Sequence, residues 1–160
     1  MKVYFEPSAL LQCYLPDQGS ENVEWVLSRL NEGEGKTSRW TLLEITRGFL
    51  KRKNLGEITS EEAEDSINFF LADIATLEQE KRVEIIDISK GVIEEALSIM
   101  RMHNIYAADA IHCATANKIG VDIILVDDRH YKKLQCASTI QMLNVSMKPK
   151  EFKNAFKGVT

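Results

Sequence analysis

The sequence predicts an α/β fold with a central, mostly parallel sheet flanked by helices. Short runs of β-branched and aromatic residues alternate with longer amphipathic segments along the whole chain, as in successive β-α-β units. The run from Asp122 to Val126 is hydrophobic without strict alternation, as expected for a strand buried on both faces. Right-handed crossovers gather the carboxyl ends of parallel strands along one edge, so we expect a ligand site there.

The composition is that of a globular protein. The 160 residues are 44% hydrophobic and 28% charged, and we expect a single domain over residues 1–160. No apolar run is long enough to span a bilayer, and the first residues lack the apolar stretch of a signal peptide, so we expect a cytoplasmic protein. Cys13, Cys113 and Cys136 are widely spaced and odd in number, which favours free thiols without a zinc site.

The net charge of −4 argues against a surface that is basic throughout, as many nucleic-acid binders have. It leaves room for a local basic patch. Three basic runs are either solvated faces or such patches: Arg47 with Lys51–Lys53, Arg129–Lys133, and Lys148–Lys157.

The first strand is predicted over residues 2–6, where β-branched and aromatic residues gather. Pro7 cannot continue a central strand but suits the first turn of a helix, which Ser8 then continues. Glu6 therefore stands at the carboxyl end of the strand. Either it caps the helix electrostatically, or it serves a ligand site in the crevice beyond the strand.

A helix is predicted over residues 40–53, where apolar residues recur every three or four positions. Glu44 lies away from that apolar stripe, on the same side as Arg47 and Lys51. Two interpretations are open: an exposed Glu44–Arg47 ion pair, or a carboxylate that serves a site.

The other elements follow from caps and periodicity. Ser20, Thr59 and Ser89 are expected to cap helices because each precedes an amphipathic stretch. The predicted elements are a helix over residues 20–31, a weak strand over 36–38, a helix over 60–77, a strand over 82–88, a helix over 90–103, a strand over 140–145 and a helix over 149–157.

The stretch Tyr106 to Ala116 reads YAADAIHCATA and has almost no polar face. Its alanines allow close packing, so we expect a buried helix that ends at Gly120. It carries a carboxylate, Asp109, in its first turn. A buried carboxylate is costly unless it is hydrogen-bonded, paired or bound to a metal, so we expect further acids and a divalent cation around it.

Two adjacent acids, Asp127 and Asp128, follow the strand that ends at Val126. They are expected at the same edge of the sheet as Glu6. One of them is explained by capping of the next helix, whereas the pair favours a cation site.

Four segments, in order, resemble the PIN-domain family, in particular the toxin ribonucleases of VapBC toxin–antitoxin pairs. DAIHCATA is close to the family's DAIHLATA and is the most specific of the four. The order and spacing agree over nearly the whole chain, so the resemblance implies a three-layer PIN-like fold. The segments are KVYFEPSALL at residues 2–11, TLLEITR at 41–47, DAIHCATA at 109–116 and ILVDDR at 124–129.

The resemblance implies a metal-dependent endoribonuclease that holds Mg²⁺ or Mn²⁺ between acidic side chains, so that a metal-bound water attacks an RNA phosphodiester. It assigns four acids and one substitute for the last of them. These are Glu6, Glu44, Asp109 and Asp128, with Asp127 as the substitute.

The same resemblance gives Ser8 the role of ordering the first acid or a metal-bound water. It implies that Arg47, Lys51 and Arg129 contact RNA phosphates. It also implies an antitoxin protein as partner and a homodimer.

The sequence departs from the family at two positions. The first acid is usually Asp, and the extra methylene of Glu6 moves the carboxylate outward, which matters because catalysis is sensitive to shifts of ~1 Å. Val126 stands where the family often has a small hydroxyl residue. A weakened PIN-like module that binds RNA or protein is therefore the alternative. A receiver-type phosphotransfer domain is disfavoured, because Asp87 lies within its predicted strand and no lysine motif follows the last strand.

Overall fold

The computed structural model describes residues 1–15, 18–127 and 140–159. Its strands form one sheet in the order β3-β2-β1-β4-β5, and every neighbouring pair is parallel. The predicted parallel α/β fold is confirmed, including the weak second strand. The strands are β1 (Val3–Phe5), β2 (Gly35–Ser38), β3 (Val83–Ile86), β4 (Ile123–Val126) and β5 (Gln141–Asn144).

The strand order reverses direction between β1 and β4. From β1 the chain moves outward to β2 and β3, and it then returns to place β4 and β5 on the other side. Phe5 pairs with Leu125, so Glu6 and Val126 stand next to each other at the carboxyl edge. Ligands of open α/β sheets bind at such a switch point, because the two crossovers diverge there and leave a crevice.

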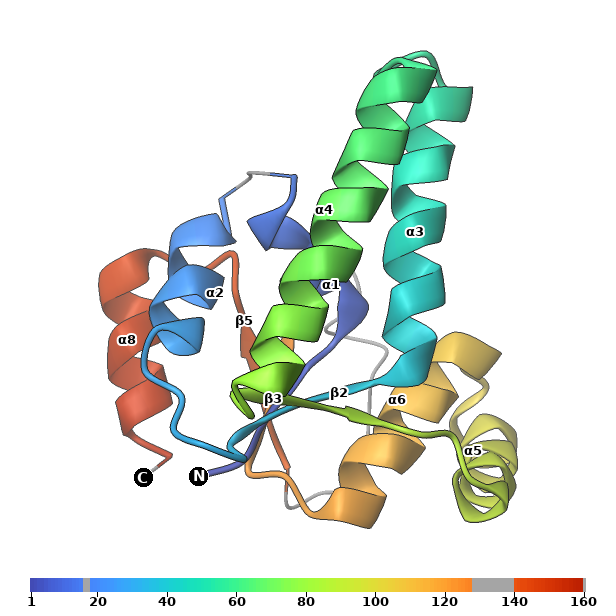
Figure 1. Ribbon diagram of the computed structural model, residues 1–160. Coiled ribbons are helices and arrows are strands. Elements are labelled where there is room, and N and C mark those ends of the chain that lie inside the picture. The colour runs from blue at the N-terminus through green and yellow to red at the C-terminus, as the bar shows by residue number, and fades with distance from the viewer. Residues whose placement is uncertain (16–17, 128–139, 160) are drawn as a thin grey trace.

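Helices cover both faces of the sheet (Figure 1). One face carries α5 and α6, and the other carries α1, α2, α3, α4 and α8. α3 and α4 lie side by side and extend beyond the sheet (Figure 1). The helices of the described residues are α1 (Pro7–Leu10), the short 3-10 turn η1 (Leu11–Cys13), α2 (Ser20–Leu27), α3 (Arg39–Asn54), α4 (Ser60–Gln79), α5 (Lys90–His103), α6 (Ala107–Ile119) and α8 (Pro149–Lys157).

The two cores follow from the alternation of side chains along each strand. In β1, Val3 and Phe5 enter the core under α3 and α4, whereas Tyr4 enters the core under α5 and α6. Tyr4 therefore faces the helix that carries Asp109.

Local sequence explains the helix ends. Thr59 Oγ1 accepts the Glu62 N–H, and the Glu62 carboxylate accepts the Thr59 N–H, which together form a capping box at α4. Gly120 ends α6 with a positive φ of 61°, which a side chain would disfavour.

The apolar stripes of α2 and α4 pack inside the molecule. Val23 and Val26 of α2, like Ile67 and Phe70 of α4, lie in the core. Within the described part of the chain, no helix has the length and apolar character that a membrane crossing needs.

The expectation of free thiols holds for one described cysteine and fails for the other. Cys13 is free. Cys113 is disulfide-bonded, so the expectation is wrong for this residue. Cys136 lies outside the described residues.

A neighbouring pair of phenylalanines in α4 tests the assignment of the core face. Phe70 is fully buried, whereas Phe69 is 64% exposed. We expect Phe70→Ala to lower the free energy of unfolding by about 3–5 kcal/mol, because it leaves a cavity. Phe69→Ala should change it by only about 0.5 kcal/mol. Urea denaturation measures both, and equal losses would contradict the assignment.

Candidate active site

Glu6 lies directly after β1 and is buried. Its Oε2 accepts the Ser8 N–H at 2.9 Å and also the Ser8 hydroxyl proton. Glu6 is thus the N-cap of α1. Ser8 bonds Oε2, and Oε1 accepts no hydrogen bond from any described residue.

Glu44 extends from α3 toward α6. Its Oε2 lies 2.5 Å from Nε2 of His112, and the imidazole is 2% exposed. The hydrogen bond to His112 takes the place of the surface ion pair with Arg47 that the sequence allowed. Glu44 Oε1 also accepts no hydrogen bond within the described residues.

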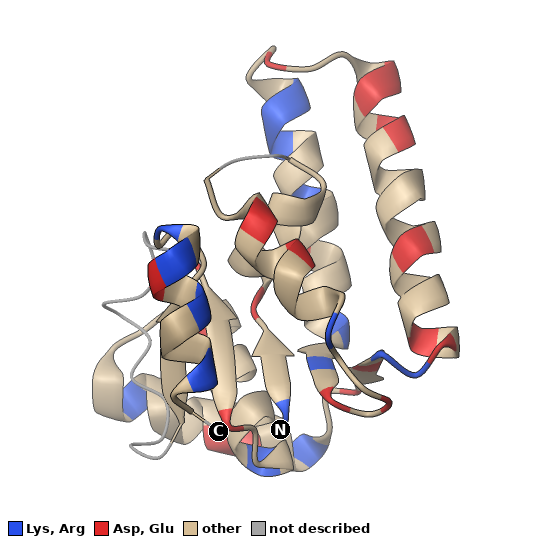
Figure 2. Ribbon diagram, turned by 90° about the vertical axis from the view of Figure 1, so that its left-hand side faces the viewer, with Lys and Arg blue, Asp and Glu red and all other residues tan. Residues whose placement is uncertain are grey.

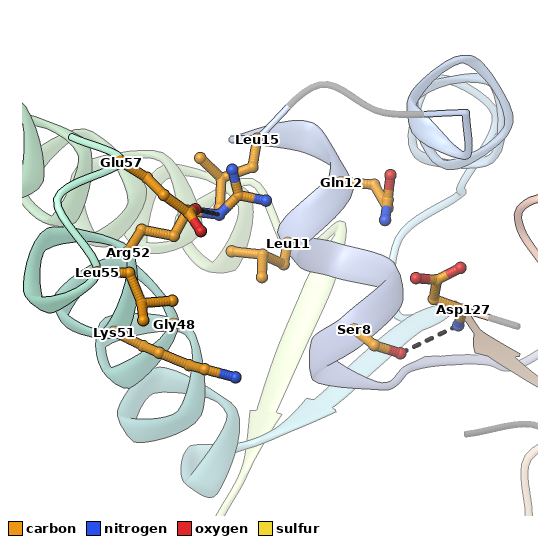
Figure 3. A pocket seen from close by; sticks show the side chains of 10 residues that line it. All are labelled: Ser8, Leu11, Gln12, Leu15, Gly48, Lys51, Arg52, Leu55, Glu57 and Asp127. Carbon is orange, nitrogen blue, oxygen red and sulfur yellow. Dashed lines mark hydrogen bonds and ion pairs between the residues drawn. The ribbon is translucent and has the colours of Figure 1, made fainter. Parts of the chain in front are cut away.

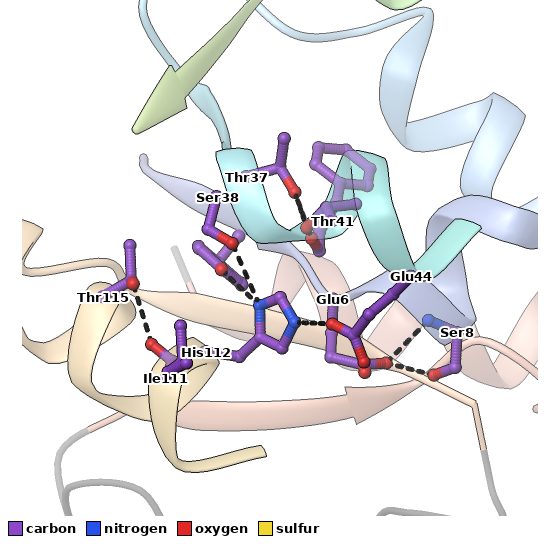
Figure 4. A network of polar contacts seen from close by, with 11 residues as sticks. Glu6, Ser8, Thr37, Ser38, Thr41, Glu44, Ile111, His112 and Thr115 are labelled. Carbon is purple, nitrogen blue, oxygen red and sulfur yellow. Dashed lines mark hydrogen bonds and ion pairs between the residues drawn. The ribbon is translucent and has the colours of Figure 1, made fainter. Parts of the chain in front are cut away.

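The carboxyl groups of Glu6 and Glu44 face one another beside the His112 ring (Figure 4). Burial raises the pKa of the Glu6 carboxyl above its usual value, His112 and Ser8 act in the opposite direction, and the negative charge of Glu44 raises it further. Two carboxyl groups that interact electrostatically thus gather negative charge beyond the end of β1.

The negative charge at this site is suited to a divalent cation. Hard cations such as Mg²⁺ and Mn²⁺ take carboxylate oxygens, and a cation would relieve the repulsion between Glu6 and Glu44. The chemistry of the two residues therefore fits such an ion. Among the described residues, however, no group of three or more His, Cys, Asp or Glu side chains is arranged to hold a metal.

Asp109 lies in the first turn of α6, one turn before His112. Residues three apart share a side of a helix, so Asp109 projects on the same side as the histidine that binds Glu44. The carboxylate is half-buried, and full burial begins only at Ala110. The expectation of a buried Asp109 is wrong, because the first turn of α6 reaches the surface.

Ser8 links the two neighbouring strand ends. Its Oγ donates to Glu6 and accepts the Asp127 N–H at 3.0 Å. The Asp127 carboxylate accepts the Ser146 hydroxyl proton at 2.6 Å. One side chain thus holds Glu6 after β1 against Asp127 after β4.

A cavity of about 370 Å³ opens next to this link (Figure 3). Ser8 and Asp127 line one side, and Lys51 and Arg52 of α3 line the other. The cavity therefore joins the acidic edge to the basic last turn of α3.

The structure describes one of the three remaining predicted site residues. Arg47 is exposed on α3 and does not line this cavity. Asp128 and Arg129 lie outside the described residues. The acidic quartet therefore stays a prediction, of which Glu6 and Glu44 are brought together.

Sequence reasoning missed two residues of this network. His112 lies inside the DAIHCATA segment, and its position three residues after Asp109 was the signal that it shares the same helix side. Tyr4 is bonded to it, with the hydroxyl oxygen 2.7 Å from Nδ1. Nothing in the local sequence indicates the partner of Tyr4.

A comparison with protein-family models finds a match to the PIN domain over residues 3–135. No curated protein is similar enough in sequence to match.

Three solved structures of similar fold are those of toxin or toxin–antitoxin proteins. VapBC2 from Rickettsia felis, bound to a promoter DNA fragment, is 17% identical with a TM-score of 0.59, covering 90% of this chain and 98% of that one. VapC20 from Mycobacterium tuberculosis, a sarcin–ricin loop cleaving toxin, is 13% identical with a TM-score of 0.60. The match covers 85% of this chain and 97% of VapC20. A chain of a toxin–antitoxin complex from Klebsiella pneumoniae is 15% identical with a TM-score of 0.57. The match covers 92% of this chain and 98% of that one. At these identities the likeness shows the fold.

The raised pKa of Glu6 predicts a pH-dependent stability. Between the usual glutamate pKa of about 4.5 and the raised value, the folded protein binds this proton more tightly than the unfolded chain does. The contribution of Glu6 to stability is therefore lost as the pH rises through that window. The Glu6→Gln variant should gain in stability relative to wild type with rising pH. Urea denaturation from about pH 4 to about pH 9, without divalent cations, measures this difference.

Glu34 provides a control of opposite sign. The Asn31 N–H and the chain's amino terminus hold the pKa of Glu34 below its usual value. The Glu34→Gln variant should therefore lose stability relative to wild type as the pH rises from that lowered pKa to the usual value of about 4.5, so this comparison starts at about pH 2. A Glu6→Gln curve that runs parallel to wild type would show that the Glu6 pKa is not raised.

Proposed function

This chain belongs to the PIN-domain family, and from that premise we propose that it is a metal-dependent endoribonuclease, the toxin of a VapBC-type toxin–antitoxin pair. The observation that carries the proposal is the pairing of Glu6 with Glu44. Glu6 stands at the switch point of the sheet, where ligands of such folds bind, and Glu44 lies near enough to raise the pKa of its carboxyl.

The proposed metal site consists of Glu6, Glu44 and Asp109, with a fourth ligand from Asp128 or Asp127. When bound, Mg²⁺ or Mn²⁺ lowers the pKa of a bound water and stabilises charge that develops on the phosphate. Ser8 holds the Glu6 carboxylate through two hydrogen bonds to Oε2, so that Oε1 would be the oxygen that binds the ion.

The cavity beside the acids is the proposed site for the RNA strand. Lys51 and Arg52 line it at the end of α3, where they would bind phosphate oxygens as direct ion pairs. Arg47 and Arg129 are proposed as further phosphate contacts. Figure 2 shows that basic residues gather in this part of α3, although the net charge of the protein is −4.

The proposed partners are a cognate antitoxin and a second copy of the chain. The likeness to toxin–antitoxin complexes supports the antitoxin. Several large apolar side chains that remain exposed support association, and we place the protein in the cytoplasm, where its RNA substrate would be. The exposed residues are Leu43, Leu55, Phe69, Leu71, Ile93, Leu97, Met102 and Tyr106.

One observation favours the alternative of a PIN-like module that binds RNA or protein but cleaves poorly. The longer side chain of Glu6 stands where the family usually has Asp, and it also serves as a helix cap. A carboxylate held by its cap has less freedom to follow the reacting groups.

Cleavage of a mixed RNA pool with Mn²⁺ or Mg²⁺ tests the proposal. We expect wild type to cleave, and we expect chelator or Asp109→Asn to lower the rate by at least about 100-fold, the upper end of the loss that follows from disturbing a metal's supporting residues. Asp122→Asn is the matched control, because this exposed acid lies at the opposite end of β4 and bonds Lys2 N–H.

The Glu6→Asp variant separates the two functions. Inactive wild type with active Glu6→Asp would favour the binding module. Cleavage that persists in Asp109→Asn would contradict the proposed site.

A further inference from the structure

His112 joins elements that are far apart in the sequence. Its ring lies at 2% exposure between α6 and the sheet, and it reaches Glu44, which is 68 positions away in the chain. The Glu44 side chain is itself 31% exposed. Without a partner, a glutamate with that exposure would sample several rotamers.

The hydrogen bonds indicate which ring nitrogen donates to Glu44. An ionised carboxylate can only accept, so His112 Nε2 carries the proton that is donated to Glu44 Oε2. In the neutral ring, Nδ1 must then accept. Tyr4 supplies the donor at 2.7 Å, and Ser38 Oγ lies at 3.5 Å from the same nitrogen.

We propose that His112, held by Tyr4, is a positioning residue that fixes the Glu44 carboxylate so that Oε1 faces Glu6 and a divalent cation. This inference rests on the proposed metal-dependent function. His112 occupies Glu44 Oε2 as Ser8 occupies Glu6 Oε2, so each carboxylate is left with one oxygen on the side of the site. A hydrogen bond of this kind orients a metal-binding carboxylate and raises metal affinity.

A role for His112 as a metal ligand is disfavoured by the same contacts. Both ring nitrogens are already engaged, Nε2 by Glu44 and Nδ1 by Tyr4. A ligand role would require the loss of one of these bonds.

Titration of purified protein with Mn²⁺, followed by calorimetry without RNA, tests the inference. We expect His112→Leu to weaken Mn²⁺ binding by about 10- to 100-fold, because Glu44 loses its donor. His112→Gln keeps an N–H donor and should recover part of the loss. Tyr4→Phe removes only the hydroxyl from a buried ring, and should weaken binding by about 10-fold while the fold is kept.

Two control variants remove similar hydrogen bonds elsewhere. Thr115→Val deletes a buried hydroxyl on α6, one turn beyond Ile111, whose carbonyl it bonds at 2.8 Å. Tyr14→Phe deletes a tyrosine hydroxyl that donates to Asp73 at 2.7 Å. Both should bind Mn²⁺ like wild type. They therefore separate a general loss of stability from the effect of losing the Tyr4–His112–Glu44 hydrogen bonds.

Nitrogen-15 NMR of the His112 ring adds a readout without metal. We expect the Nε2–H tautomer in wild type and a mixture of tautomers in Tyr4→Phe. An Nδ1–H tautomer in wild type would overturn the inference, and so would Mn²⁺ binding that is equal in wild type, His112→Leu and Tyr4→Phe. In that second case the proposed function would stand. Wild type that binds no Mn²⁺ would overturn both.

Discussion

The crowding of two carboxylates at one strand end is the constraint around which the site is organised. Glu6 and Glu44 meet in a partly buried crevice, where water screens their charges poorly. Each carboxylate is held through one oxygen, Glu6 by Ser8 and Glu44 by His112. The negative charge of Glu44 raises the pKa of the buried Glu6 carboxyl, and His112 and Ser8 oppose that rise only in part.

The topology of the sheet explains why the crevice is there. The chain leaves β1 in one direction and β4 in the other, so that α1 and the segment after β4 diverge beyond adjacent strand ends. Ser8 links the two strand ends, because its hydroxyl donates to Glu6 and accepts the Asp127 N–H. The basic end of α3 borders the same opening. That border carries Lys51 and Arg52, and Arg52 also pairs with Glu57 at 3.9 Å.

The two cores take different parts in the site. The core under α3 and α4 supports Glu44 from its own helix, through Ile45 and Phe49. The core under α5 and α6 supplies His112 and, from the other side of β1, Tyr4. Because neighbouring residues of a strand face opposite layers, Tyr4 and Phe5 connect both cores to Glu6. The geometry of the acids therefore depends on the packing of all three layers.

The sequence by itself determined the order of helices and strands, because periodicity and caps such as Thr59 and Ser89 act within a few residues. It also placed Glu6 and Asp127 at strand ends, since Pro7 and the end of a hydrophobic run mark those positions locally. Only the tertiary structure decided that Glu44 bonds His112 rather than Arg47, and that Asp109 is half-buried. Those outcomes depend on how α3 and α6 pack across 68 positions of chain, and no local pattern encodes the distance between two helices.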